Sequence, residues 1–255
     1  MKKVCYSITA ALFFVHLLSA AAKITFHTTL ENAASVKREG GSVVGGGQFV
    51  PGVRGNGFIS NERTAVVHFP MHKILGEHYL DEGTLECWLI LGWDIDKFTN
   101  KTGKDEAFMF WAYNRAQTDA IGLMIGGGRN RPVAQFRVRE VRNEWHNAVS
   151  AKLNWKEGEI HHMAGTWGAA GLHLYLDGEL AAQNRYKGGP ANIIERMSIN
   201  NNETDPAKFP TYSIVDELKI HDEQLPARAI PDLMTLSVEP GAKLATTWGG
   251  IKKIR

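Results

Sequence analysis

The stretch 159–180 reads Glu-Ile-His-His-Met-Ala-Gly-Thr-Trp-Gly-Ala-Ala-Gly-Leu-His-Leu-Tyr-Leu-Asp-Gly-Glu-Leu, and it decides the fold. In residues 172–176 leucine alternates with histidine and tyrosine, which is the period of a half-buried strand. Asp177-Gly178 follows at once and favours a hairpin, because a type I′ turn needs positive φ at both central positions. Residues 160–167 are also strand-like, and the Gly-containing segment 168–171 supplies their turn. We therefore predict a three-stranded antiparallel meander.

Similar short extended segments recur along the rest of the chain. They cover residues 24–30, 42–44, 64–69, 84–91, 108–113, 121–125, 133–141, 193–199 and 211–221, with a polar loop at 31–47 and short helical segments at 71–81 and 225–233. No segment with a 3.6-residue period is long enough for a major helix. About a dozen short strands predict an all-β fold of two packed antiparallel sheets, a jelly-roll sandwich.

Length and composition are those of one large globular domain. The chain has 255 residues, of which 44% are hydrophobic and 22% are charged. Residues 1–22 combine Lys2 and Lys3 with an apolar run and three alanines, the pattern of a cleaved secretory signal peptide. The alternative is a membrane anchor, but the run at 8–18 is shorter than the ~20 residues that a spanning helix needs. We expect a secreted protein with a domain at 23–237 and a basic tail at 238–255, which is either a flexible terminus or a docking segment.

Removal of the signal peptide changes both the charge and the cysteine count. Without Lys2 and Lys3 the chain has 27 basic and 27 acidic residues, so strong nonspecific binding to nucleic acid is not expected. Cleavage also removes Cys5 and leaves Cys87 alone, so no internal disulfide can form. Because Cys87 alternates with leucines, we expect a small buried hydrophobic residue.

The central stretch carries a family resemblance. His-His-Met-Ala-Gly-Thr-Trp and Leu-His-Leu-Tyr-Leu-Asp-Gly resemble the central motif of laminin-G-like, concanavalin-A-like and pentraxin-like jelly-roll domains. Residues 83–89 (Gly-Thr-Leu-Glu-Cys-Trp-Leu) resemble that family's early core strand, and residues 214–222 resemble its closing strand. The three segments occur in the family's order and spacing. The resemblance implies the sandwich fold over roughly residues 24–230 but is much less specific for function.

In such sandwiches, carbohydrate is bound by aromatic platforms and polar side chains on one sheet. The candidates that face away from the predicted core here are Glu86, Trp88, Trp111, Tyr113, Gln135, Arg137 and Arg139. The aromatic side chains equally suit core packing, and the polar residues equally suit a strand that faces solvent. A stripe of arginines also suits an acidic glycan.

Catalytic constellations of the resembling enzymes are missing from the sequence. The related hydrolases use a Glu-x-Asp-x-x-Glu strand, whereas Trp88 stands where Glu86 would need a second carboxylate. Asp216 and Glu217 are adjacent, so their side chains point to opposite faces of a strand. The lyases need clustered Arg, Gln, His and Tyr, and the adjacent His161 and His162 also point oppositely. We therefore expect no enzyme activity.

If a metal is bound, calcium is a better candidate than an ion on the adjacent His161 and His162, since many relatives of this fold hold calcium with loop oxygens. The candidate ligands are Asp216 and Asn201, the latter in the run of asparagines at 200–202. Asp216 equally resembles a structural carboxylate that caps loop amides. No zinc motif of the His-x-x-His or Cys-x-x-Cys type is present.

Taken together, these features favour a secreted, non-catalytic recognition domain that binds a glycan or a cell-surface ligand. The alternatives are a structural or protein-interaction module without a sugar site, and a divergent glycoside hydrolase or polysaccharide lyase. We also predict that Trp167, which ends the first strand of the meander, is a buried anchor whose indole N–H reaches a carbonyl of the turn at 168–171.

Overall fold

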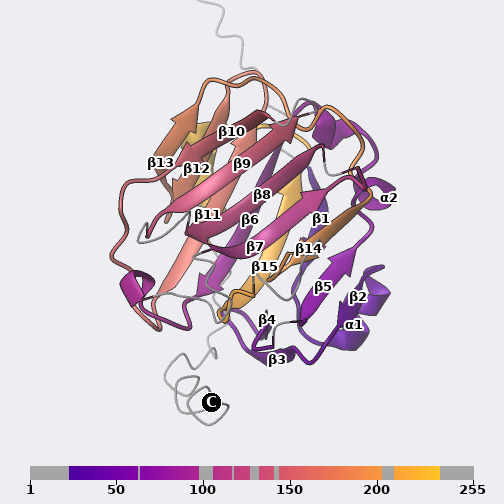
Figure 1. Ribbon diagram of the computed structural model, residues 1–255, viewed down its shortest axis with the longest axis vertical. Coiled ribbons are helices and arrows are strands. Elements are labelled where there is room, and N and C mark those ends of the chain that lie inside the picture. Colours follow the sequence, from indigo (N-terminus) through magenta and orange to yellow (C-terminus); the bar gives the residue numbers. More distant parts are fainter. Residues whose placement is uncertain are drawn as a thin grey trace, which may run out of the picture.

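The computed structural model describes residues 23–62, 64–97, 106–116, 118–126, 132–140, 144–202 and 210–235, which form a sandwich of two antiparallel sheets. The strands of the eight-stranded sheet, in spatial order, are β13 (Glu179–Asn184), β12 (Leu172–Leu176), β11 (Ile160–Trp167), β6 (Gly83–Ile90), β15 (Ile214–His221), β4 (Asn56–Ile59) and β3 (Gln48–Pro51), and β1 (Ile24–Thr28) also pairs with β15. Those of the seven-stranded sheet are β10 (Glu144–Val149), β9 (Ala134–Glu140), β8 (Ala120–Gly126), β7 (Glu106–Tyr113), β14 (Arg196–Ile199), β5 (Val66–Phe69) and β2 (Ser42–Val44). Figure 1 shows β7, β8 and β9 crossing in front of β6, β11 and β15. The all-β prediction is confirmed.

The predicted meander is present as β11, β12 and β13. Met163 pairs with Leu176 across β11 and β12, and the next hairpin turns through Asp177 and Gly178. Both turn residues have positive φ, at 50° and 82°, as the Asp-Gly signal requires. The other edge of β11 pairs with β6 along its whole length, which places this meander beside the early core strand.

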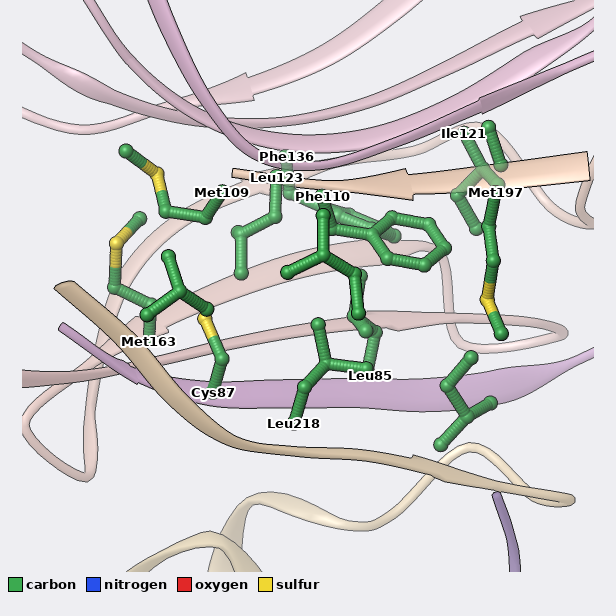
Figure 2. Close-up of a cluster of buried hydrophobic side chains, with 14 of the residues drawn as sticks. Leu85, Cys87, Met109, Phe110, Ile121, Leu123, Phe136, Met163, Met197 and Leu218 are labelled. Carbon is green, nitrogen blue, oxygen red and sulfur yellow. The ribbon is translucent and has the colours of Figure 1, made fainter. Parts of the chain in front are cut away.

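The core lies between the sheets. Cys87 is fully buried beside Met163 and Leu218, and it faces Met109 and Phe110 of the opposite sheet (Figure 2). Burial of this thiol also raises its pKa, so it remains a neutral, apolar filler as predicted. Apolar contact between the two inner faces is the main source of stability in such a sandwich.

A β-bulge in β7 changes which residues face outward. The pairing with β8 shifts register between Phe108 and Phe110, so Met109 and Phe110 both point into the core. Phe108 consequently lies on the outer face with Trp111, at a ring-centroid distance of 4.8 Å. Strict alternation along residues 108–113 would put Phe108 on the opposite face from Trp111, but the extra residue of the bulge interrupts the period.

Trp167 is the buried anchor that its position predicts, with 1% of its surface exposed. Its indole packs over Gly83, where a Cβ would lie 2.3 Å from the ring. The expected hydrogen-bond partner is wrong, because the indole N–H donates to the Tyr79 carbonyl at 2.8 Å and not to the following turn. The ring therefore ties β11 to the segment that leads into β6.

Helices are short and peripheral. α1 (Ala33–Arg38) lies in a segment predicted as a loop; it forms because Asn32 and Ser35 make a reciprocal capping box. α2 (Met71–Leu75) and η1 (His78–Leu80) occupy the predicted helical connection, and η2 (Ile95–Lys97) follows β6. No helix among the described residues is both long enough and apolar enough to cross a membrane.

The C-terminal helical segment, η3 (Ala227–Ala229) and α3 (Ile230–Leu233), covers part of one outer face. Leu225 and Ile230 pack against Ala164 and Tyr175, which lie on the side of the eight-stranded sheet that faces away from the core. The predicted helical turn is thus confirmed and acts as a cover for β11 and β12. The predicted signal peptide, residues 1–22, and tail, residues 238–255, lie outside the described residues.

Candidate functional site

The outer face of the seven-stranded sheet carries most of the predicted ligand-binding residues. Cross-strand register arranges its side chains in three rows over β7, β8, β9 and β10. The rows are Tyr113–Ala120–Arg139–Trp145, Trp111–Gly122–Arg137–Asn147 and Phe108–Met124–Gln135–Val149. Because directly opposite residues in a sheet lie side by side, each row is a continuous strip of surface.

Two tryptophans form the centre of this face. Gly122 lets the Trp111 indole approach the backbone, since a Cβ at this position would lie 2.2 Å from the ring. Trp145 stacks on Trp111 at a centroid distance of 5.9 Å and an interplanar angle of 21°. Trp111 is consequently only 6% exposed, whereas Trp145 is 41% exposed. The aromatic surface offered to solvent is therefore that of Trp145.

Two guanidinium groups lie over the partly exposed indole. The Cζ atoms of Arg137 and Arg139 lie 5.6 Å and 5.0 Å from the Trp145 ring centroid, within cation–π range. Arg137 Nε donates to Gln135 Oε1 at 3.0 Å, and its guanidinium lies 3.5 Å from Glu106. Burial lowers the pKa of Arg137, and the Glu106 charge opposes this, so the guanidinium remains protonated. We call Trp111, Tyr113, Gln135, Arg137, Arg139 and Trp145 the tryptophan–arginine surface.

A hollow of about 660 Å³ opens at one end of this surface, where β7 ends and β14 begins. It is lined by Asn114, Arg115, Ala116, Thr118, Asn192, Ile193 and Glu195. The buried Asp119 carboxylate organises these loops: it accepts hydrogen bonds from the amides of Ala191 and Asn192 at 2.9 Å and 3.1 Å. The hollow is therefore formed by the loops that directly follow Tyr113 in β7 and precede Arg196 in β14.

Glu86 and Trp88 lie on the outer face of the other sheet, so the structure does not bring them to the tryptophan–arginine surface. Glu86 is 1% exposed and accepts hydrogen bonds from His162 Nε2 at 2.8 Å and His221 Nε2 at 3.0 Å. Burial raises the pKa of Glu86, but these bonds and the charge of Lys219 outweigh it, and the pKa falls to about 2. Glu86 is a buried anion held by its neighbours.

The predicted calcium ligands do not fit a calcium ion. Asp216 accepts the Arg54 and Glu217 amides, both at 2.8 Å, with one backbone N–H on each carboxyl oxygen. Burial and the neighbouring Glu217 raise its pKa to about 8 against the effect of these amides. Asn201 instead donates to the Ala65 carbonyl at 3.0 Å. Asp216 therefore fits the alternative of a carboxyl group that caps a loop.

Trp145 is the central residue that the sequence analysis missed. The sequence pattern predicts no strand between residues 141 and 152, where the structure has β10. The available signal was the alternation of outward Trp145 and Val149 with buried Ala148, directly after the well-defined strand β9. Two strands separated by a short polar segment favour a hairpin, which would have placed Trp145 opposite Arg139.

Comparisons with known proteins agree with the fold. Residues 79–230 match the model of the concanavalin A-like lectin/glucanases superfamily. This match covers more than half of the chain, and the chain belongs to that superfamily. No curated protein sequence is significantly similar to it.

Solved structures with the same fold have diverse roles. Domain 4 of AbnA, an extracellular GH43 arabinanase from Geobacillus stearothermophilus solved with arabinotriose, superposes with a TM-score of 0.59 at 12% identity, covering 83% of this chain and 98% of that one. The binding domain of botulinum neurotoxin DC, solved with rat synaptotagmin II, gives 0.55 at 11% identity, covering 76% and 45%. The Trypanosoma rangeli sialidase, solved with the inhibitor DANA, gives 0.50 at 16% identity, covering 75% and 29%. At these identities the likeness concerns the fold alone.

Proposed function

We propose that this protein is a secreted, non-catalytic domain that binds acidic carbohydrate through the tryptophan–arginine surface. The observation that carries the proposal is the cluster of the 41% exposed Trp145 indole with the Arg137 and Arg139 guanidinium groups over its ring. An aromatic ring packs against the C–H face of a sugar, and guanidinium groups form paired hydrogen bonds with carboxylates or sulfates. Both kinds of contact are thus available to a single sugar residue.

Charge on this face favours an anionic ligand. Arg196 continues the row of Tyr113, Arg139 and Trp145 onto β14. Within the described part of this face, Glu106 is the carboxylate that contacts the surface, through Arg137. A net positive patch on a chain of balanced overall charge attracts acidic partners specifically. The adjoining hollow gives room for a further sugar unit or substituent.

Binding without catalysis is supported by the chemistry of the same residues. Glycoside hydrolysis needs two carboxyl groups on either side of the scissile bond. The described tryptophan–arginine surface contains no carboxyl group, and Glu106 lies at its border in contact with Arg137. The arabinanase domain solved with arabinotriose is a precedent for a sugar ligand on this fold. Secretion is proposed from the signal-peptide pattern of residues 1–22.

The test uses the chain from residue 23 onward and three polysaccharides: polygalacturonate, heparin and neutral arabinan. We expect binding to an acidic polymer, and a loss of at least about tenfold in affinity for Trp145→Ala and for Arg139→Ala. Arg228→Ala is the matched control, because Arg228 is an exposed arginine on the cover of the opposite face. Equal binding by all three variants, or no binding to any acidic polymer, contradicts the proposal. Release of reducing sugar would contradict its non-catalytic part.

A protein partner is the second candidate, and the outer side of β10 favours it. Val149 and Trp145 are 44% and 41% exposed on this strand, which is the last of its sheet. Exposed apolar side chains on an edge strand are a typical protein-docking feature. The toxin binding domain solved with synaptotagmin II shows that this fold also occurs in a protein complex. Val149→Ser removes the exposed apolar side chain without adding charge, and unchanged binding of acidic glycan by this variant favours carbohydrate.

A further inference from the structure

The hairpin of β9 and β10 carries a second cluster of side chains, on the opposite side of the strands from Trp145. Glu140 ends β9, and it pairs directly with Glu144, which begins β10. His146 follows two residues later on the same side as Glu144. One ligand atom from each of these three residues lies within 4.8 Å of the other two. We propose that Glu140, Glu144 and His146 form a binding site for a zinc ion.

The His146 imidazole is held in position by Tyr186, which follows β13 of the eight-stranded sheet. The His146 ring stacks on Tyr186 with a centroid distance of 3.8 Å and an interplanar angle of 8°. The Tyr186 hydroxyl donates to the Gly189 carbonyl at 2.9 Å and lies 3.3 Å from Glu140 Oε2. This packing directs His146 Nε2 toward Glu140 Oε1, 3.0 Å away. Outer contacts of this kind orient metal-binding histidines.

Electrostatics at the cluster favour a cation. Like charges directly opposite each other destabilise a sheet, and here two glutamates form such a pair. Within the described residues, no lysine or arginine forms an ion pair with Glu140 or Glu144. Glu144 is exposed and the side chains of His146 and Glu140 are 20% and 31% exposed, so an ion can enter from solvent. A divalent ion would neutralise both carboxylates at once.

The donor set selects the metal. Calcium takes six to eight oxygen ligands, whereas one imidazole and two carboxylates suit zinc, with a water at the fourth position. Tetrahedral ligands about 2.0–2.1 Å from zinc lie roughly 3.3 Å apart. The observed separation of 3.0 Å between His146 Nε2 and Glu140 Oε1 is close to that value. A small movement of the side chains therefore opens the pair to an ion.

The test is calorimetric titration of the untagged, metal-free chain from residue 23 onward with zinc chloride and, separately, calcium chloride. We expect one zinc ion per chain, no competition from calcium, and a rise in the thermal unfolding midpoint on zinc addition. Glu144→Gln and His146→Gln should each weaken zinc binding at least tenfold. His78→Gln, at an exposed histidine on η1, should bind like the wild type.

Glu144 is exposed, and its substitution removes one of two like charges that face each other across the hairpin, so Glu144→Gln should unfold at or slightly above the wild-type midpoint without metal. If Glu144→Gln and His146→Gln both bind zinc like the wild type, or if His78→Gln loses binding as they do, the site is wrongly placed. If the wild type binds no zinc, the proposal fails whatever the result with glycans.

Discussion

At the scale of single residues, Glu86 shows how a charge is accommodated beneath the surface of the eight-stranded sheet. Two histidines donate to its two oxygens, and Lys219 lies 3.8 Å away. These contacts hold its pKa at about 2, below the value of about 4.3 for an unfolded chain. A carboxyl group whose pKa is lowered by folding adds stability above its unfolded pKa, and the contribution disappears as pH falls through the folded value.

We therefore expect Glu86→Gln to lower the free energy of unfolding at pH 7 by on the order of 3 kcal/mol. The deficit should shrink between about pH 4 and pH 2, where the wild-type carboxylate itself becomes protonated. Urea unfolding at both ends of this range measures the difference. Glu179→Gln, at an exposed glutamate of β13, is the control and should differ little from wild type at either pH. An equal deficit for Glu86→Gln at both pH values would contradict the charge-based explanation.

Trp167 carries a second prediction at this scale. Truncation to alanine removes a fully buried indole and leaves a cavity over Gly83, which should cost roughly 3–5 kcal/mol. That is a large share of the ~5–15 kcal/mol typical of a whole domain. Trp145→Ala is the matched comparison and should cost about 1 kcal/mol, because 41% of the Trp145 surface is already exposed in the folded protein. Chemical denaturation of both variants tests this order, and a reversed order would show that the faces are wrongly assigned.

At the scale of strands, the outer face depends on Gly122. A methyl group here would press on the Trp111 ring, whose movement is restricted by Trp145 above it. We expect Gly122→Ala to destabilise the protein by about 1–3 kcal/mol and to weaken binding of acidic polysaccharide by displacing Trp145. Thermal unfolding and the binding assay measure the two effects. Unchanged stability together with unchanged binding would mean that the indole pair is not needed.

The strands also show which parts of the fold the sequence can reveal. The meander was predictable because alternation and the Asp-Gly turn agree, and both are local signals. The bulge at Met109 was not, since the choice between one and two inward residues depends on the pairing with β8. β10 was missed for a related reason: it is short and mostly polar, and it is defined by its partner β9 more than by its own pattern.

Site residues were predictable only in part. Alternation with a period of two correctly predicts that Trp111, Tyr113, Arg137 and Arg139 face away from the core. It contains no information about which sheet each strand belongs to. Trp88 was therefore grouped with Trp111, although β6 and β7 belong to different sheets. Sheet membership follows from long-range pairing, for which a single sequence contains little information.

At the scale of the whole molecule, the distribution of charge determines the salt dependence expected of the proposed binding. Because residues 23–255 contain equal numbers of acidic and basic residues, we expect long-range attraction to come from the local arginine cluster and not from net charge. We expect affinity for polygalacturonate or heparin to fall at least severalfold between about 0.05 M and 0.5 M salt, since the Debye length shortens well below the span of the cluster. Titration at increasing salt measures this. A salt-independent affinity would point to a neutral ligand held by Trp145 alone.

Leu225 and Ile230 cover the outer face of the eight-stranded sheet, which we call the back, and the tryptophan–arginine surface is on the opposite side, which we call the front. The described chain ends at residue 235, after α3 has packed on the eight-stranded sheet, whereas Trp145 and Arg139 look outward from the seven-stranded sheet. The C-terminal end of α3 therefore lies at the back of the molecule. A bead, a carrier domain or a cell envelope attached there would leave the front facing the medium, so immobilisation through the C-terminus should preserve capture of soluble polysaccharide.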